Sequence, residues 1–495
     1  MPIMDEPTSL DPQIADSNSE KLVAANCYEG LVRIMADGTI GKGVATDWNI
    51  SDDGLTYTFK LRNNSHWAMF SGHKAVLGEN YEDTFDITVK AEDFKFGIER
   101  TLSEQTGSAD APLFSAVKSI STPDDFTIVF NLSYADDNFL YALTNPGAMP
   151  CNEEFFNLTN GKYGLDAKYL LCNGPFHVSK WTEKTSVKLV KNNEYNGESS
   201  VSPSSVTFYI NNDDSEVADK MNSVTYDVAF LSSSQFSSIE NKKDLNSVAV
   251  QNVTYSFIFN QNDNNYRNKN MRLAFCRSCD TSSLFDSQSD ISKADGIVPP
   301  SCKIGGEDYR NGNAAELLSY DEMLAKKNFN DALLELGSSS VETTILCTEQ
   351  YEPFVKQMVQ KLQKTLGVKF VSTVKVVSES DLEAAVNDGN YSVAFYPFKA
   401  KSSFAGEIIE GFDQNNIFGY ESDVLSQKIR NIKNNSGSLE GERSAVADAE
   451  NYLVSEAVIM PVFYENSYFV TSKKTSGIYF YSSADNVCFI NAKKS

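Results

Sequence analysis

Val-Thr-Tyr-Ser-Phe-Ile-Phe-Asn, residues 253–260, is the stretch on which the predicted fold depends. Tyr255, Phe257 and Phe259 alternate with smaller or aliphatic residues, and a polar cluster at residues 260–265 ends the run. Alternation of this kind, closed by turn-forming residues, is typical of a buried β-strand. We therefore predict a strand here that leaves one domain.

A second run of the same character lies near the C-terminus, at Ile459–Val470. The roughly 200 residues between the two runs are enough for a separate lobe, which one strand would enter and the other would leave. In this interpretation the two strands are crossings that form a hinge. The pattern leaves a second interpretation open, in which both runs are ordinary core strands of one sheet.

Length and composition indicate a folded, acidic protein. The chain has 495 residues, 41% of them hydrophobic and 12% aromatic, which is ordinary for a globular protein and suggests about three domains. Its 67 Asp and Glu against 43 Lys and Arg give a net charge of −24. Such a field repels phosphate backbones, so nucleic acid is not an expected partner, and we expect the acidity to serve solubility.

No stretch approaches the about 18 to 20 consecutive apolar residues that cross a bilayer. The first residues, Met1-Pro2-Ile3, do not begin a basic segment followed by an apolar one. We expect the protein as given to be soluble. An export signal or lipid anchor would precede these residues, so a cytoplasmic location does not follow.

The sequence carries no recognisable catalytic or metal-binding motif. Its three histidines lack the spacing that places imidazoles around zinc, and we expect no enzyme activity, cofactor or metal. Cys151 and Cys172 each precede a turn, and a bridge between them is possible if their strands are neighbours. Cys276 and Cys279 have redox-motif spacing, but they follow a helical pattern rather than a strand-to-helix junction.

Local patterns predict further elements, with Gly72–Thr88 read as a loop. The predicted helices are Ser19–Gly30, ending at Gly30 as a C-cap, and Ala91–Leu102; the predicted strands are 57–61, 126–132, Ser186–Lys191 and Val206–Ile210.

Between the two crossing runs the pattern changes to βαβαβ. Strands are predicted at Val341–Cys347, Val368–Val377 and Tyr391–Phe398, with a helix ending at Gly367 and a short one at Asp381–Val386. This order requires a parallel sheet, and open α/β sheets bind ligands at the carboxyl ends of their strands. We therefore expect ligand contacts at Phe398, Lys399, Ala400 and Lys401, although a plain surface loop fits the same residues.

Several motifs, in order along the chain, resemble the large solute-binding proteins of ABC importers, the oligopeptide, dipeptide and nickel-binding family. The most specific is Trp48-x-x-Ser51-Asp52-Asp53-Gly54-Leu55-Thr56-Tyr57-Thr58-Phe59-x-Leu61-Arg62 followed by Trp67. The others are Pro7-Thr8-Ser9-Leu10-Asp11-Pro12 with Tyr28-Glu29-Gly30-Leu31, Val89-Lys90-Ala91-Glu92-Asp93-Phe94, Asn173-Gly174-Pro175-Phe176, Asn268-x-x-Met271-Arg272-x-Ala274-Phe275 leading to Asp280, Gly296-Ile297-Val298-Pro299-Pro300, and Leu366-Gly367-Val368.

The resemblance implies an α/β, two-lobed periplasmic-binding-protein-like fold with three domains and two hinge strands, in which the lobes close around the ligand. Lobe 1 would comprise a core domain from 1–32, 151–258 and 466–495 and an accessory domain from 33–150, with lobe 2 at 259–465. The expected partners are a peptide or other small-molecule solute and an ABC permease. We expect a monomer located outside the cytoplasm, either periplasmic or held on the cell surface as a lipoprotein.

By the same resemblance, three segments would line the ligand-binding site. They are Asp16, Ser17 and Asn18; Thr254, Tyr255, Ser256 and Phe257; and Phe398, Lys399, Ala400, Lys401 and Ser402. Peptide-binding members carry an Asp after the third strand to pair with the ligand's α-ammonium, but this sequence has Lys401 there. A cation cannot hold a cation, so an unusual peptide pose or an anionic or sugar-like solute is expected.

Two other functions stay open for this sequence. A sensory receptor of the same fold would pass ligand occupancy to a signalling partner instead of a permease. A secreted enzyme with an interlobe cleft is the third hypothesis, against which the missing nucleophile counts.

Overall fold

The computed structural model describes residues 1–35, 39–197, 200–211, 213–281, 291–399, 404–413, 416–481 and 486–495. The chain forms two compact units, unit 1 from Met1–Ala249 and Tyr468–Ser495, and unit 2 from Val250–Ser467. Within the described part of the chain, every helix is too short or too polar to cross a membrane.

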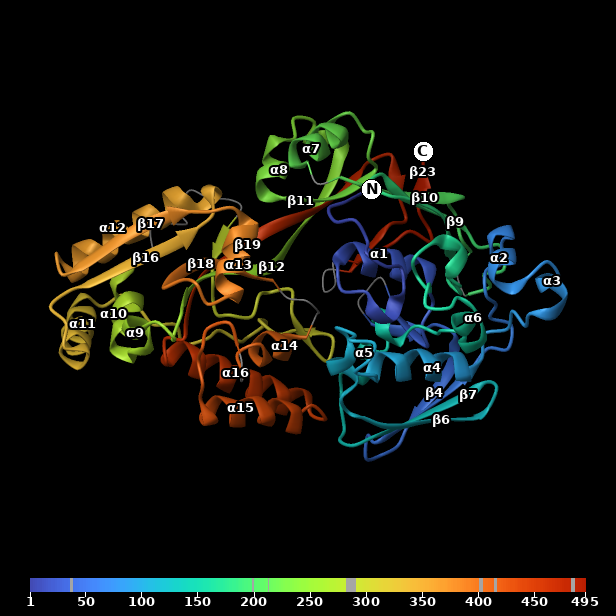
Figure 1. Cartoon of the computed structure of the whole chain (residues 1–495), viewed down its shortest axis with the longest axis horizontal. Coiled ribbons are helices and arrows are strands. Elements are labelled where there is room, and N and C mark those ends of the chain that lie inside the picture. The colour runs from blue at the N-terminus through green and yellow to red at the C-terminus, as the bar shows by residue number, and fades with distance from the viewer. Residues whose placement is uncertain are drawn as a thin grey trace. The chain divides into compact units, whose positions relative to one another are not determined.

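The chain passes between the units within two long strands, β12 (Leu245–Phe259) and β19 (Ile459–Ser472) (Figure 1). They contain the two runs that the sequence singled out, and they are neighbours in a seven-stranded sheet with the order β11-β19-β12-β18-β16-β17, to which β13 adds at β19. The two runs are therefore both crossings between the units and paired strands of one sheet. The proposed boundaries at 258/259 and 465/466 fall on these same strands.

Unit 2 contains the predicted βαβαβ unit. β16 (Val341–Cys347) pairs in parallel with β17 (Phe370–Val376) and with β18 (Val393–Lys399), and α12 (Glu352–Leu366) and α13 (Glu379–Asn387) make the crossovers. The helix α12 ends where Gly367 takes a φ of 79°, a conformation that favours glycine.

Within unit 2 the seven-stranded sheet has a hydrophobic core on each face. Phe257 and Phe259 of β12 belong to one core, whereas Ile258 between them belongs to the other, as the two-residue period of a strand requires. The remaining elements of unit 2 are α9 (Asn264–Arg267), α10 (Lys269–Ser278), β13 (Ile291–Lys293), β14 (Lys303–Ile304), β15 (Glu307–Asp308), α11 (Glu322–Leu336), α14 (Ala405–Glu410), α15 (Asp423–Asn434) and α16 (Leu439–Ser455).

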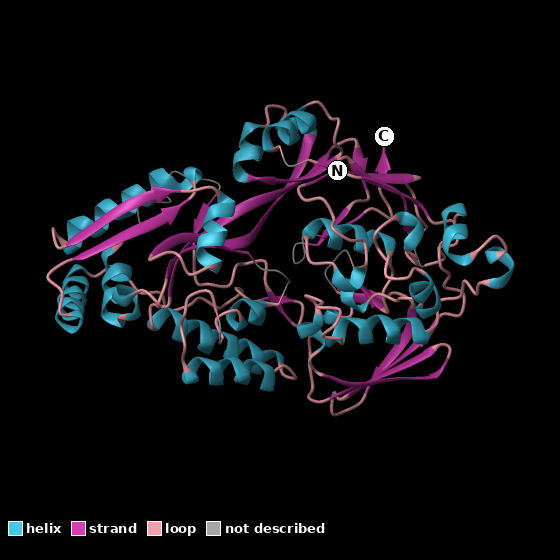
Figure 2. Ribbon diagram, in the orientation of Figure 1, coloured by secondary structure: helices cyan, strands magenta, loops and turns pink. Residues whose placement is uncertain are grey.

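Unit 1 contains two four-stranded sheets, β1-β10-β9-β8 and β4-β5-β7-β6. Helix α4 (Ala91–Leu102) packs on the second of these sheets (Figure 2). Its Phe94 and Ile98 side chains are buried. The first part of unit 1 comprises β1 (Pro2–Ile3), η1 (Pro12–Ile14), α1 (Asn18–Cys27), β2 (Val32–Ile34), β3 (Ile40–Lys42), β4 (Ala45–Ile50), β5 (Thr56–Leu61), η2 (Ser71–His73), α2 (Lys74–Leu77), α3 (Tyr81–Thr84), α4 (Ala91–Leu102), η3 (Ala111–Phe114), β6 (Val117–Asp124), β7 (Thr127–Leu132), α5 (Phe139–Ala142), η4 (Pro146–Ala148) and α6 (Glu153–Leu158). The rest comprises η5 (Ala167–Tyr169), β8 (Phe176–Thr182), β9 (Ser186–Lys191), β10 (Ser205–Ile210), α7 (Asp214–Asn222), β11 (Val228–Ser232), α8 (Ser233–Ser238), η6 (Lys242–Asp244), β20 (Thr475–Ser476), β21 (Tyr479–Tyr481), β22 (Asn486–Cys488) and β23 (Lys493–Lys494).

Two local predictions in unit 1 were wrong. Helix α1 ends at Cys27, and Tyr28 is already extended with φ −120° and ψ 157°, so Gly30 is not a C-cap. A Cβ on Gly30 would lie 3.1 Å from the Val32 carbonyl oxygen and 3.2 Å from the Leu143 carbonyl oxygen of a distant segment, so the glycine instead permits close backbone packing. The segment 72–88, predicted as a loop, contains α2 and α3, which at four residues each are too short to show a helical period.

Candidate functional site

Two of the three predicted site segments lie side by side in unit 2. β12 and β18 are antiparallel, so that Thr254 faces Phe398 and Val253 faces Lys399. Lys399 is exposed at the carboxyl end of β18, which is the end where parallel α/β sheets bind ligands. Three further predicted residues, Ala400, Lys401 and Ser402, lie outside the described residues.

Thr254 and Ser256 carry the polar groups of this segment. They are two positions apart on β12, so their side chains lie on the same face of the sheet, and both residues are completely buried. Neither hydroxyl has a hydrogen-bond partner in the described part of the chain. A buried hydroxyl without a partner costs on the order of 1–3 kcal/mol, which makes these two groups candidates for hydrogen bonds to a ligand.

The alternate residues of β12 face the opposite core. The Phe257 ring is fully buried and packs 5.3 Å from Phe275 and 4.9 Å from Phe395 between ring centroids. The ring centroids of Tyr255 and Tyr351 lie 4.4 Å apart. Burial, and to a smaller extent the Glu465 carboxylate, raise the pKa of the Tyr255 phenol. The Phe257 side chain is therefore a core group, and its backbone lies in a strand that is paired with β18 on one side and β19 on the other.

Phe398 belongs to a stack of three aromatic rings beside the end of β18. Its ring centroid lies 5.9 Å from Phe412 and 5.7 Å from Phe418, with interplanar angles of 23° and 28°. Phe412 and Phe418 are themselves nearly parallel, at 6° and 4.5 Å. The stack fixes the Phe398 ring, which is half-buried, at the predicted ligand-binding edge.

The third predicted segment, Asp16, Ser17 and Asn18, belongs to unit 1 at the start of α1. Asp16 and Asn18 are exposed. Ser17 is the N-cap of α1, and its hydroxyl accepts a hydrogen bond from the Glu20 backbone N–H at 3.2 Å. The Glu20 side chain in turn accepts from the Ser17 N–H, which completes a capping box.

The Glu20 carboxylate accepts hydrogen bonds from two segments that precede α1. Its Oε1 atom accepts from the Thr8 N–H (2.7 Å), the Thr8 hydroxyl (2.8 Å) and the Ser9 N–H (3.3 Å). Its Oε2 atom accepts from the N–H groups of Asp16 (3.0 Å) and Ser17 (3.2 Å). Burial alone would raise the pKa of this carboxyl, but the hydrogen bonds from Asp16 and Thr8 outweigh burial and lower the pKa.

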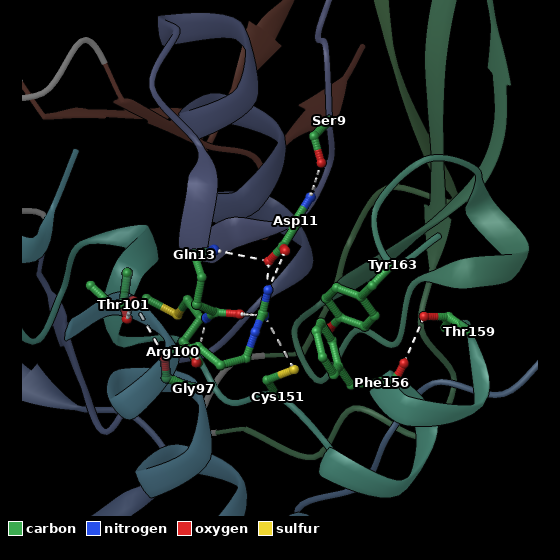
Figure 3. Close-up of polar contacts among 12 residues, drawn as sticks. Ser9, Asp11, Gln13, Gly97, Arg100, Thr101, Cys151, Phe156, Thr159 and Tyr163 are labelled. Carbon is green, nitrogen blue, oxygen red and sulfur yellow. Dashed lines mark hydrogen bonds and ion pairs between the residues drawn. The ribbon is translucent and has the colours of Figure 1, made fainter. Parts of the chain in front are cut away.

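A buried ion pair fixes the opening motif to α4 (Figure 3). The Arg100 guanidinium donates to both carboxylate oxygens of Asp11, at 3.2 and 2.6 Å, and to Gln13 Oε1 at 2.6 Å. Its carbon Cζ lies 4.1 Å from the centre of the Phe156 ring. Burial opposes the charge, but Asp11 outweighs burial and raises the pKa of Arg100.

Sequence reasoning did not single out Glu20 or Arg100 as functional. The pattern Ser17-x-x-Glu20 is the signature of a capping box, so a signal for Glu20 was present. Arg100 gave no such signal, because its partner Asp11 is distant in sequence.

The cysteines and histidines do not form a chemical site in the described residues. No three His, Cys, Asp or Glu side chains there group to hold a metal ion. His73 is buried, with its Nε2 atom 3.1 Å from the Leu170 carbonyl oxygen. Cys276 and Cys279 are buried, and burial raises the pKa of the Cys276 thiol to about 12, so it is not a reactive thiolate at neutral pH.

The bridge considered between Cys151 and Cys172 is not formed. Both are free thiols, and the Cys151 sulfur accepts a hydrogen bond from Arg100 at 3.5 Å.

Unit 2 also contains a cavity of about 320 Å³, walled by residues that include Cys276, Cys279, Leu318 and Met460. None of the predicted ligand-binding residues that the structure describes lines this cavity. It is therefore separate from the edge formed by β12 and β18.

Comparison with known proteins gives consistent results. The family described as bacterial extracellular solute-binding proteins, family 5 Middle, matches residues 39–418. The dipeptide-binding protein DppE of Bacillus subtilis (strain 168) is 24% identical over 496 residues, covering 96% of this chain and 88% of DppE.

Two solved structures are similar over the full length of the chain. The dipeptide binding protein from Pseudoalteromonas sp. SM9913 in complex with Met-Leu has a TM-score of 0.78 at 18% identity, covering 100% of this chain and 99% of that one. Listeria monocytogenes OppA bound to peptide has a TM-score of 0.77 at 21% identity, covering 100% and 98%. The predicted periplasmic-binding-protein-like α/β fold is thereby confirmed.

Proposed function

Because the chain belongs to the bacterial extracellular solute-binding proteins of family 5, we propose that it captures a peptide or a similar small solute outside the cytoplasm and delivers it to an ABC permease. Proteins of this family bind solutes, and the chain is not an enzyme. DppE is named as a dipeptide-binding protein, and OppA of Listeria monocytogenes is described as bound to peptide; both names favour a peptide as the solute.

The observation that carries the proposal is the pair of buried hydroxyls on β12. Thr254 and Ser256 have no hydrogen-bond partner among the described residues, although both are completely buried. Peptide ligands commonly bind in extended form, with their backbone groups hydrogen-bonded to strands and neighbouring side chains. We propose that the two hydroxyls receive such backbone groups, which would make recognition tolerant of the peptide's sequence.

The remaining predicted contacts complete the proposed site. The segment 398–402 of unit 2 is also proposed to contact the ligand, as are Asp16, Ser17 and Asn18 of unit 1. Lys401 in the first of these segments would favour an anionic group of the ligand. We propose further that the protein is a monomer, either held on the cell surface as a lipoprotein or located in the periplasm, and that residues 33–150 form an accessory domain of unit 1.

Calorimetric titration with defined peptides tests the proposed function. We expect the purified chain to bind a dipeptide or short oligopeptide, and we expect Thr254→Val and Ser256→Ala each to weaken binding by about 2- to 10-fold, the worth of one neutral hydrogen bond. Thr373→Val is the matched control, because Thr373 is an exposed threonine on β17 of the same sheet. It should leave the affinity unchanged.

One result would refute the proposed class of solute, and another would refute the proposed binding site. Absence of binding to every peptide tested, combined with binding of a sugar or an organic anion, would exclude the peptide as solute. Unchanged peptide affinity in both Thr254→Val and Ser256→Ala would exclude the β12 face as the binding site.

A further inference from the structure

The cavity of about 320 Å³ in unit 2 has an apolar interior and a polar mouth. Among the lining residues that the structure describes, those that are buried carry aliphatic, thiol or thioether side chains, such as Val454 and Met460. Those that are exposed are Lys293, Ser319 and Tyr320, which all carry polar groups. Since exposure marks the opening to solvent, apolar groups line the depth of the cavity and polar groups surround its mouth.

Backbone contacts hold the walls of this cavity in place. Strand β13 pairs antiparallel with β19, and beside the cavity the Ala294 N–H donates to the Val462 carbonyl oxygen at 3.1 Å. The segment before α11 contributes the lining residue Leu318. This segment is joined to the end of α10 by a hydrogen bond from the Asp321 N–H to the Arg277 carbonyl oxygen at 3.0 Å. The cavity is therefore built into the secondary structure of unit 2.

Lys293 places a positive charge at the mouth of the cavity. The residue is exposed, and it forms no ion pair with a carboxylate of the described residues. Asp280 is the one residue with a carboxylate among the described lining residues, and the Lys361 ammonium donates to its backbone carbonyl oxygen. Two ammonium groups and one carboxylate thus lie in or beside this wall, so the mouth favours an anion over a cation.

The volume of the cavity sets the size of its ligand. At about 30 Å³ for each water molecule, a space of about 320 Å³ holds roughly ten waters, and a ligand of roughly ten non-hydrogen atoms fills the same space. Pockets for small molecules in proteins start at about 300 Å³, so the cavity is large enough for a ligand. A ligand that covers the apolar walls also gains the free energy of removing them from water.

We propose that this cavity is a second ligand-binding site, which takes a medium-chain aliphatic carboxylate. The carboxylate pairs with the Lys293 ammonium at the mouth, and the aliphatic tail lies inside against Val454, Met460 and Val462. The chemistry of the walls therefore selects a ligand with one negative charge and an apolar tail of limited length. The proposal does not depend on which solute binds at the edge formed by β12 and β18, because the cavity is separate from that edge.

A ligand in this cavity contacts β19 where that strand begins. Ile459 and Met460, the first two residues of β19, line the cavity, and β19 is one of the two strands in which the chain passes between the units. A ligand that binds the folded chain and not the unfolded one stabilises the folded chain by mass action. Octanoate should therefore raise the melting temperature of the protein, and it should do so only when the cavity is intact.

Calorimetric titration of the wild-type chain with probes of different length and charge tests the proposal. Octanoate has ten non-hydrogen atoms, and we expect it to bind with a Kd below about 1 mM. Hexanoate should bind about 15-fold more weakly, because each buried methylene group is worth about a 4-fold change in affinity. Dodecanoate is longer than the cavity admits and should bind no more tightly than octanoate. Octan-1-ol has a similar tail but no charge, and it should bind at least about 10-fold more weakly than octanoate.

Two substitutions locate the site. Lys293→Met should weaken octanoate binding by about 10-fold and leave the binding of octan-1-ol unchanged. Lys375→Met is the matched control, because Lys375 is an exposed lysine on β17 of the same unit, and it should bind both probes as the wild type does. Leu318→Trp should fill the cavity and abolish octanoate binding. Leu334→Trp, at a position on α11 that is 81% exposed, should leave octanoate binding unchanged.

Three results would overturn the proposal. The first is the absence of octanoate binding to the wild-type chain. The second is an affinity that keeps rising from octanoate to dodecanoate, which is expected of adsorption to exposed apolar surface. The third is an unchanged octanoate affinity in both Lys293→Met and Leu318→Trp. The length series and the comparison with octan-1-ol use the wild-type chain, so they test the site even if a variant does not fold.

Discussion

Replacing Glu20 by Gln removes one of the two carboxylate oxygen atoms that accept hydrogen bonds from the residues preceding α1. The carboxylate accepts hydrogen bonds from Thr8, Ser9, Asp16 and Ser17. Gln is nearly the same size, but it offers one acceptor oxygen and one NH₂ group. Whichever way the amide turns, one set of N–H donors faces another donor and is left without a partner.

The expected loss of stability follows from the number of bonds broken. If the amide oxygen keeps the three contacts from Thr8 and Ser9, the N–H groups of Asp16 and Ser17 lose their acceptor. Both donors are partly buried, so each one left without a partner costs up to the roughly 1–3 kcal/mol of a fully buried group. We therefore expect Glu20→Gln to lower the free energy of unfolding by about 3 kcal/mol and the melting temperature by an amount on the order of 5 °C.

The effect should depend on pH in a defined direction. The hydrogen bonds lower the pKa of Glu20 in the folded chain, so the folded state binds its proton less readily than the unfolded state does. The stabilisation by Glu20 is therefore fully present above the unfolded pKa of about 4.3 and is lost as the pH falls through the lower folded value. The wild type and Glu20→Gln should differ most at neutral pH and converge in acid.

The assay is thermal unfolding of both proteins from pH 7 to pH 3. Other acidic groups titrate in the same range, but they are common to both proteins and cancel in the difference. Glu154→Gln is the control, since Glu154 is exposed in the first turn of α6, and it should change the melting temperature little at any pH. A wild-type advantage over Glu20→Gln that stayed constant down to pH 3 would refute the assigned role of the charge.

Two further substitutions test unit 2 and the ligand. Glu450 is 1% exposed, and its carboxylate accepts hydrogen bonds from Arg310, Tyr309 and the N–H groups of Ile297 and Val298. We therefore expect Glu450→Gln to lower the free energy of unfolding, measured in urea, by about 3 kcal/mol. A loss no greater than that of the control Glu440→Gln, at an exposed position, would contradict this expectation. If the solute places an anionic group against Lys401, Lys401→Asp should weaken its affinity, measured by calorimetry, by at least about 10-fold. An unchanged affinity would show that Lys401 does not contact the ligand.

The parts of the fold that sequence predicted well are those encoded by local periodicity. Alternation of Tyr255, Phe257 and Phe259 marks β12, and the spacing of Phe94 and Ile98 marks α4, because each period reflects a buried face of a single element. Four-residue helices such as α2 contain little more than one turn and leave no period. The end of α1 was misplaced because Gly30 resembles a C-cap, whereas its role is to admit the backbone of a distant segment.

The predicted site was only partly accessible to sequence reasoning. The pairing of Thr254 with Phe398 joins residues far apart in the chain, and no local pattern encodes it. The resemblance to a known family implied only that both segments line one site. The alternation of side chains along a strand does exclude part of the predicted site. Thr254 and Ser256 cannot share a face with Tyr255 and Phe257, so the four side chains could not all line one site, and Phe257 lies in the core.

The residues that identify the family and those that select a solute have different tasks in this chain. Asp11 of the opening motif is paired with Arg100, and Glu20 shortly after it holds five hydrogen bonds, so changes there act on the stability of unit 1. Strand β18 instead ends at the exposed Lys399, and it is just beyond this edge that the sequence departs from the peptide-binding pattern, at Lys401. If Lys401 contacts the solute as proposed, substitution there would alter the preferred charge of the solute while the buried networks keep the fold, and family membership alone would not determine the ligand.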